Sequence, residues 1–164
     1  MYVDNDPLVL VHAQALLTSS TEGACAYVDA DVRDPERILA EAAKTLDLSR
    51  PVALTMLGIM GQISDAERPA DLVSTLMSAL PSGSYLALSD GTDTNEALNT
   101  AVEVYNGQSA NTYHLRSPQR IASFFAGLEL VEPGVVSTAA WRPEADRPEE
   151  DTADVSVCGV AVKK

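Results

Sequence analysis

The sequence predicts an α/β fold with a doubly wound sheet that is mostly parallel and ends in an antiparallel hairpin. Apolar runs typical of strands alternate with helical patterns along most of the chain. Near the C-terminus two strand-like stretches follow each other without a helix, which indicates a reversed strand at one edge of the sheet. The chain has 164 residues, of which 46% are hydrophobic, so we expect one core and a single domain over residues 1–164.

The first two strand-and-helix units are bounded by the same signals. Residues 1–4 and 24–28 are predicted strands, and each is followed by an Asp-Pro pair that suits a helix start. Asp6 and Asp34 are therefore interpreted as helix caps. Apolar side chains recur on the helices that follow and are expected to face the core: Val9, Ala13, Leu16 and Leu17 in the first, and Ile38, Leu39, Ala42 and Leu46 in the second.

The next units form the centre of the predicted sheet. Residues 51–58, PVALTMLG, are nearly continuously apolar, which is typical of a parallel strand covered on both faces. A helix over residues 69–80 and a strand over 84–89 follow. Further helices are expected at about 94–106 and from 117 to 127.

The hairpin consists of residues 135–141 and 155–162. An acidic, proline-rich loop over residues 142–154 separates the two strands, and we assign it no chemistry.

Composition excludes several classes of function. The net charge of −13, without a basic run, would repel a phosphate backbone, so no nucleic-acid partner is expected. No apolar run approaches the roughly 20 residues that span a bilayer, so we expect no membrane partner and a cytoplasmic location. The two cysteines and two histidines form no metal-ligand spacing, and no metal site is expected.

Acids at the carboxyl ends of strands are the informative residues, because doubly wound folds bind ligands there. Asp4 is the best-placed candidate, since a carboxylate can accept two hydrogen bonds from a ribose diol. Asp31 is interpreted either as a ligand or as a solvated turn residue.

Specific motifs then suggest a family. They are YVDNDP (2–7), YVDADVRDP (27–35), LRSPQRIASFFAGLELVEPGVV (115–136) and Trp141-Arg142-Pro143. The chain resembles an actinobacterial S-adenosylmethionine-dependent methyltransferase family, of class I with a Rossmann-like sheet, along nearly its whole length. The resemblance implies S-adenosylmethionine as cofactor and methyl transfer to an unidentified small-molecule acceptor.

The resemblance also implies roles for individual residues. Asp4 would bind the ribose hydroxyls and Asp31 would contact the adenine. The segment from 57 to 62 would pass near the methionine moiety, where glycine lets the backbone approach closely. The residues assigned to the cofactor in this way are Asp4, Asn5, Asp31, Val32, Leu57 and Gly58.

No catalytic residue is assigned. The polar segment from 107 to 116 occupies a place where such folds often build the acceptor pocket, and Tyr105, Tyr113, His114 and Arg116 surround it. His114 is interpreted either as a base near neutral pH or as a plain surface residue.

Family members begin with a strand and a glycine-rich turn, and the chain contains no GxGxxG-like string. The resemblance therefore implies an N-terminally truncated domain that lacks the first strand, which would lie between the second and fourth. Three outcomes are open: the second strand closes against the fourth, another chain supplies a strand, for example in a homodimer, or the fragment folds poorly.

Two alternative functions are open as well. A truncated chain would act as a non-enzymatic nucleoside-binding or assembly module if it retained the adenosine-contacting acids alone. A nicotinamide-dependent oxidoreductase is the other alternative, because an acid that ends the second strand also binds the ribose of that cofactor.

Overall fold

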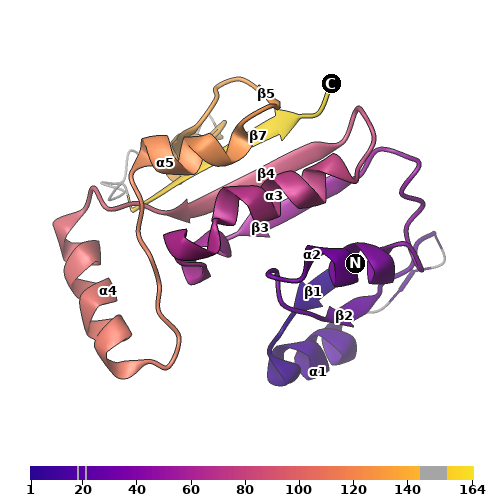
Figure 1. Ribbon diagram of the computed structural model, residues 1–164, viewed down its shortest axis with the longest axis horizontal. Coiled ribbons are helices and arrows are strands. Elements are labelled where there is room, and N and C mark those ends of the chain that lie inside the picture. The colour runs from indigo at the N-terminus through magenta and orange to yellow at the C-terminus, as the bar shows by residue number, and fades with distance from the viewer. Residues whose placement is uncertain (18, 21, 145–154) are drawn as a thin grey trace.

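The computed structural model describes residues 1–17, 19–20, 22–144 and 155–164, so residues 145–154 of the predicted acidic loop lie outside the described residues. Its first sheet has two parallel strands, β1 (Tyr2–Asp4) and β2 (Tyr27–Asp29) (Figure 1). Helix α1 (Pro7–Leu16) connects them, and α2 (Pro35–Ala42) follows β2.

Both capping predictions are confirmed in this first part. The side chain of Asp6 accepts a hydrogen bond from the Leu8 N–H, and that of Asp34 accepts one from the Arg37 N–H. Three of the four residues predicted to face the core from the first helix are wrong: Val9, Leu16 and Leu17 are exposed, while Leu10 is the residue of α1 that is buried. The α1 face that packs inward is thus rotated from the predicted stripe.

A second sheet has the order β3-β4-β7-β5, with β6 also paired to β7. Strands β3 and β4 are parallel, and β7 is antiparallel to β4, β5 and β6. The strands are β3 (Ala53–Leu57), β4 (Tyr85–Gly91), β5 (Glu129–Leu130), β6 (Val136–Ser137) and β7 (Ser156–Val162).

The predicted hairpin exists as the β6–β7 pair, but the prediction that the reversed strand lies at an edge is wrong. Strand β7 lies inside the sheet, because β5 pairs along its outer side. The first hairpin strand is also shorter than predicted. It ends after two residues, at β6, because the chain turns into the 3₁₀ helix η4 (Thr138–Ala140).

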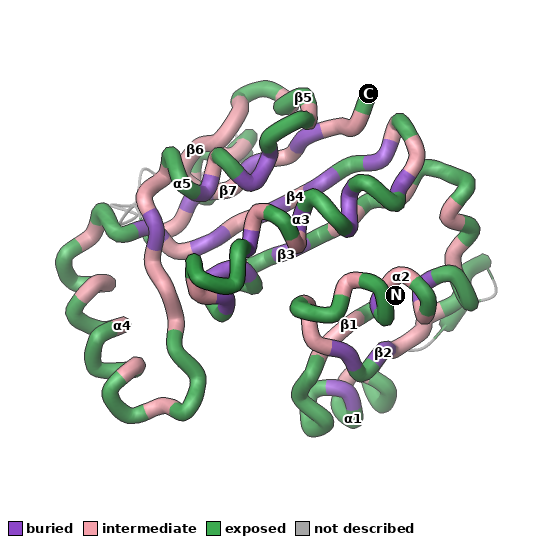
Figure 2. The backbone as a smooth tube through the Cα atoms, viewed as in Figure 1, coloured by how far each residue is buried: buried purple, intermediate pink, exposed green. Residues whose placement is uncertain are grey.

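Helices and short 3₁₀ turns complete the fold. They are η1 (Met60–Gln62), η2 (Asp65–Glu67), α3 (Pro69–Ser78), α4 (Glu96–Gln108), α5 (Pro118–Ala122) and η3 (Ser123–Phe125). Helix α4 has no buried residue and lies apart from the sheet, whereas buried segments concentrate along β4, β7 and α3 (Figure 2). The largest side chains that are fully buried in this core are Met60, Ile63, Leu86, Leu88 and Ile121.

Strand β3 differs from its prediction. Its sequence is typical of a strand covered on both faces, yet Ala53, Thr55 and Leu57 are exposed, and Leu57 is 63% exposed. The exposed side chains alternate along the strand, so they lie on one face of it, and that face is uncovered. Among the residues that the structure describes, β3 pairs with β4 alone and β1 with β2 alone. The arrangement in which the second strand closes against the fourth is therefore wrong.

None of the helices in the described residues has the length and apolar character needed to cross a membrane.

Candidate functional site

A cavity of about 500 Å³ lies beyond the carboxyl ends of β1, β2 and β3. Both sheets contribute to its walls. Five of the six residues assigned to a cofactor line it: Asp4, Asn5, Asp31, Val32 and Gly58. Leu57 is not among its lining residues.

The ends of β1 and β2 are fixed by local hydrogen bonds. The Asp4 carboxylate accepts one from the Asp6 N–H at 2.9 Å, which sets the turn into α1. The Asn5 side-chain amide donates to Asp31 Oδ2 at 2.9 Å, so the two strand ends are joined. Asp31 Oδ1 in turn accepts from the Arg33 N–H at 2.8 Å.

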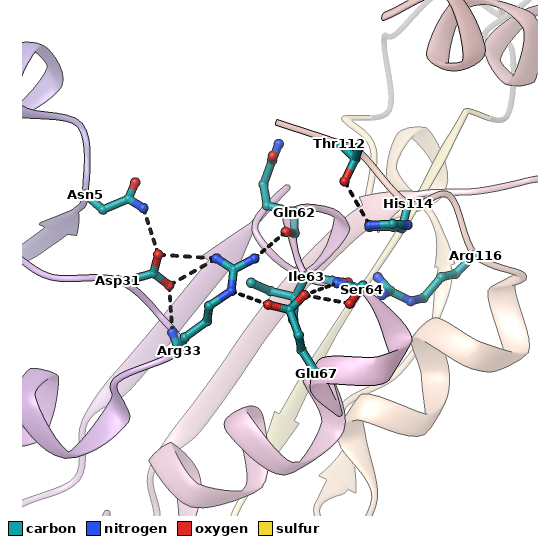
Figure 3. Close-up of polar contacts among 10 residues, drawn as sticks. All are labelled: Asn5, Asp31, Arg33, Gln62, Ile63, Ser64, Glu67, Thr112, His114 and Arg116. Carbon is teal, nitrogen blue, oxygen red and sulfur yellow. Dashed lines mark hydrogen bonds and ion pairs between the residues drawn. The ribbon is translucent and has the colours of Figure 1, made fainter. Parts of the chain in front are cut away.

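The guanidinium of Arg33 connects the two sheets (Figure 3). Its Nη1 lies 3.2 Å from each oxygen of Asp31, and its Nε donates to Glu67 Oε1 at 2.5 Å. Its Nη2 donates to the carbonyl oxygen of Gln62 at 3.0 Å. Asp31 follows β2, while Gln62 and Glu67 follow β3, so Arg33 holds the cavity walls together. Gln62 ends the 57–62 segment that was expected near the methionine moiety, whereas Arg33 and Glu67 were not predicted; a lone arginine two residues after Asp31 was the available signal.

These contacts shift the pKa values of the acids. Burial alone would raise the pKa of Asp31, but the hydrogen bond from the Arg33 backbone and the guanidinium charge outweigh it and lower the pKa. The hydrogen bond from Arg33, with those from Ser64, lowers the pKa of Glu67 from 4.5 to about 2. Both carboxylates are consequently charged at neutral pH.

Gly58 provides a stretch of open backbone at the end of β3. Its φ is +71°, a conformation that favours glycine, and its N–H donates to the Ser89 carbonyl at 2.8 Å. An added Cβ there would meet no atom within 4 Å. A ligand in the cavity can therefore approach this backbone closely.

The opposite wall comes from the end of α4 and the segment after it, through Tyr105, Ala110, Asn111 and Thr112. Thr112 Oγ1 lies 3.2 Å from Nε2 of His114, and the His114 N–H donates to the Gly61 carbonyl. His114 itself is half-buried and is not among the residues that line the cavity.

Arg116 and Tyr113 do not line the cavity; their side chains form hydrogen bonds within the fold. Arg116 is 5% exposed, pairs with Asp65 at 2.9 Å, and donates to the carbonyls of Met60 and Ile63. It thereby fixes the η1 segment that follows Gly58.

The Tyr113 hydroxyl donates to Asp90 Oδ1 at 2.5 Å. Burial raises the pKa of Asp90, and burial together with this hydrogen bond raises the pKa of Tyr113 to about 12. Asp90, the last residue but one of β4, is 3% exposed and does not line the cavity.

Across the ranges that the structure describes, no group of three or more His, Cys, Asp or Glu side chains could hold a metal ion. The polar groups that line the cavity are carboxylates, side-chain amides, hydroxyls, the Arg33 guanidinium and open backbone.

The fold and the cavity define an α/β protein of the kind that binds ligands beyond the carboxyl ends of its strands. The profile of the S-adenosyl methyltransferase family matches residues 1–164, and the chain belongs to that family. The similarity to actinobacterial members inferred from the motifs is confirmed by two solved structures.

The first is a DUF574 family protein from Streptomyces avermitilis, with 41% identity and a TM-score of 0.92, where the match covers 99% of this chain and 64% of that one. The second, a candidate methyltransferase from Thermobifida fusca, has 35% identity and a TM-score of 0.84, with 99% and 62% covered. This chain thus spans less than two thirds of either relative.

More distant structures share the fold alone. Human N-acetylserotonin methyltransferase, solved in complex with SAM, has 12% identity and a TM-score of 0.55, and the match covers 99% of this chain and 39% of that one. No curated protein matches the sequence.

Proposed function

We propose that residues 1–164 form one domain carrying the adenosine-binding part of an S-adenosylmethionine-dependent methyltransferase site, which transfers a methyl group to a small-molecule acceptor in the cytoplasm. One observation carries the proposal: a single cavity at the strand ends gathers Asp4, Asn5, Asp31, Val32 and Gly58. Family membership supports the identity of the cofactor.

The hydrogen-bond acceptors and the apolar side chain in the cavity suit an adenosine group. A ribose diol offers two hydroxyl donors, and the Asp4 carboxylate, which accepts one backbone N–H, retains acceptor capacity for them. The charged carboxylate of Asp31 can accept from the adenine amino group, and Asn5 and Arg33 hold its orientation. Val32 offers apolar contact to the base beside them.

The methionine end would pass Leu57 and Gly58, where the backbone is open. The bound cofactor supplies an electrophilic methyl group on its sulfonium. The chain's contribution is to orient the cofactor and the acceptor for in-line transfer, and we assign no catalytic residue. Tyr105, Asn111 and Thr112, on the opposite wall, are placed to meet the acceptor.

As part of the same proposal, the first strand and glycine-rich loop of the family have no counterpart in this sequence, and their place is the space between β1 and β3. The unpaired facing edges of these strands and the greater length of the relatives support this. Alternatively, a homodimer covers these edges. Sedimentation at two protein concentrations tests this, because a dimer would show a molecular mass that rises with concentration.

The test is transfer of a radiolabelled methyl group from S-adenosylmethionine to a panel of small-molecule phenols, amines and carboxylates. Transfer that falls in Asp4→Ala and persists in Asp29→Ala, an exposed acid outside the cavity, supports an enzyme. Nucleoside binding without transfer to any acceptor favours the non-enzymatic binding or assembly module. Binding of NAD in preference to S-adenosylhomocysteine would contradict both.

A further inference from the structure

The segment that follows α4 is held in place beside Thr112. The side-chain amide of Asn106 donates to the Tyr113 carbonyl at 2.9 Å, and its Oδ1 accepts from the Tyr113 N–H at 2.7 Å. The His114 N–H donates to the Gly61 carbonyl at 2.7 Å. Because these contacts fix the backbone at residues 113 and 114, the fold also sets the position of Thr112 at the cavity.

Thr112 connects the cavity to His114, which lies outside it. Thr112 lines the cavity, and its Oγ1 lies 3.2 Å from Nε2 of the His114 ring (Figure 3). When the imidazole is neutral with its proton on Nδ1, the threonine hydroxyl donates to Nε2, and its oxygen keeps lone pairs for a donor in the cavity. A proton can therefore pass from a bound ligand through the hydroxyl to the ring.

Asp65 interacts electrostatically with the same ring. The hydrogen bond from Arg116 is the main cause of the lowered pKa of Asp65, and the charge of His114 contributes to the lowering. The attraction acts in both directions, so the Asp65 carboxylate stabilises the ring when it takes up a proton.

The charges of the cavity favour a neutral acceptor. Among the described residues that line it, Arg33 is the one cation, and its guanidinium is already bound to two carboxylates and a carbonyl oxygen. A carboxylate or phosphate acceptor would therefore meet no uncommitted positive charge. The other polar side chains towards the acceptor wall are neutral: Gln62, Tyr105, Asn111 and Thr112.

A phenol fits this wall better than an aliphatic alcohol. A neutral hydroxyl must lose its proton when its oxygen accepts a methyl group. A phenolic hydroxyl has a pKa of about 10, whereas an aliphatic hydroxyl is a far weaker acid, so an imidazole at neutral pH can assist only the phenol. Tyr105 lines the wall and offers an aromatic ring against which an aromatic acceptor can pack.

We propose that the acceptor of this site is a neutral phenol whose hydroxyl donates to Thr112 Oγ1, with His114 as the proton acceptor behind it. The inference rests on the proposed function, because it concerns the acceptor end of the same cavity. Thr112 is the residue that touches the acceptor, whereas His114 acts through Thr112.

Methyl transfer and proton transfer are coupled in this arrangement. As the phenol oxygen forms its bond to the methyl carbon, the carbon–sulfur bond of the bound cofactor breaks and its electron pair stays on sulfur. The phenol proton passes to Thr112 Oγ1, and the proton of Thr112 passes to Nε2 of His114. The products are a methyl ether, neutral S-adenosylhomocysteine and an imidazolium, which returns its proton to the solvent.

Competition between acceptors tests the substrate class. Phenol, aniline and benzoate are each offered to the full 164-residue chain with radiolabelled S-adenosylmethionine. Transfer to phenol should be at least about tenfold faster than transfer to the other two. Transfer to aniline or benzoate that is as fast as transfer to phenol would overturn the assignment of a neutral phenol.

Two phenols of different acidity separate proton transfer from a structural role. At about pH 8 phenol is almost entirely neutral, while 4-nitrophenol is largely ionised. His114→Gln should lower kcat/KM about a hundredfold for phenol but less than about tenfold for 4-nitrophenol, because the ionised acceptor has no proton to lose. His12→Gln, at an exposed residue of α1, should change neither value. Equal losses for both phenols in His114→Gln would overturn the relay.

Nuclear magnetic resonance gives a readout that does not depend on activity. The chain has two histidines, so His12→Gln assigns their ring signals. Phenol titrated into the chain with S-adenosylhomocysteine should shift the ring signals of His114 and leave those of His12 unchanged. Thr112→Val should weaken phenol binding by about tenfold, whereas Thr45→Val, exposed and outside the cavity, should not. Absence of phenol binding, or binding that leaves the His114 signals unshifted, would overturn the proposal.

Failure of this proposal differs from failure of the proposed function. Binding of S-adenosylhomocysteine with transfer to an acceptor other than a phenol overturns the phenol and the relay alone. A folded chain that does not bind S-adenosylhomocysteine overturns both. Circular dichroism checks folding, which His114→Gln should preserve because the backbone hydrogen bond from residue 114 to Gly61 needs no imidazole.

Discussion

The side-chain amide of Asn5 lies 2.9 Å from Oδ2 of Asp31, so a hydrogen bond joins the carboxyl ends of two neighbouring parallel strands. Because the amide donates to one oxygen and Arg33 contacts both, the carboxylate is held in one orientation before any ligand arrives. A preorganised acceptor of this kind lowers the entropic cost of binding a nucleoside.

Asp31→Asn should weaken S-adenosylhomocysteine binding by about tenfold, because it replaces a charged acceptor by a neutral one. Isothermal calorimetry measures the effect. The matched control is Asp29→Asn, an exposed residue at the end of the same strand that does not line the cavity. An equal loss of S-adenosylhomocysteine affinity in the two variants would mean that Asp31 contributes only to the net charge of the region and makes no specific contact with the ligand.

The ion pair of Arg33 and Glu67 should make stability depend on pH. The pKa of Glu67 is about 2 in the folded chain and ordinarily 4.5, so the stabilisation is present above about pH 4.5 and is lost as the pH falls towards 2. The difference in urea midpoint between wild type and Glu67→Gln should therefore narrow from about pH 5 to about pH 3. Glu103→Gln, on exposed α4, serves as control. A difference that stays constant over this range would contradict the ion pair.

Tyr113→Phe should destabilise the chain by about 1–3 kcal/mol at neutral pH, because the buried Asp90 carboxylate loses its hydroxyl donor. Burial raises the pKa of Asp90, so its proton is held more tightly in the folded chain than in the unfolded one. The stability linked to that proton is lost as the pH rises. Because the Tyr113 hydroxyl donates to the charged form of Asp90, the destabilisation caused by Tyr113→Phe should decrease towards acid pH. Urea unfolding at two pH values checks this, with the exposed Tyr105→Phe as control. A cost that grows in acid would be inconsistent with a charged partner.

Two glycine substitutions should have opposite signs. A Cβ on Gly61 would overlap the ring of Tyr113, so Gly61→Ala should destabilise the chain by about 1–3 kcal/mol. Gly107 lies in α4 with no atom within 4 Å of such a Cβ, and Gly107→Ala should stabilise by up to about 1 kcal/mol. Urea midpoints compare the two, and destabilisation by both variants would count against the described packing.

Local signals predicted much of the fold. The Asp-Pro pairs located two helix starts, since capping depends on residues within one turn. The place of β7 inside the sheet could not be predicted, because it depends on pairing with β5, some 30 residues away. The exposure of β3 could not be predicted either. An apolar composition indicates that a strand is suited to burial, but it does not show which elements pack against that strand.

The candidate site divides in the same way. Asp4, Asn5 and Asp31 could be located because strand ends and motifs are readable in sequence. The Arg33–Glu67 pair joins residues 34 positions apart and follows only from how the two sheets lie. The buried state of Asp90 and Arg116 likewise depends on the segment after α4 packing onto η1.

Isothermal calorimetry of the 164-residue chain with S-adenosylmethionine and S-adenosylhomocysteine, repeated on Asp4→Ala and Asp29→Ala, tests the central claim most directly. We predict saturable binding of both compounds by wild type and Asp29→Ala, and loss of binding in Asp4→Ala. No heat with the folded wild-type chain, or undiminished binding by Asp4→Ala, would contradict a cofactor site at these strand ends.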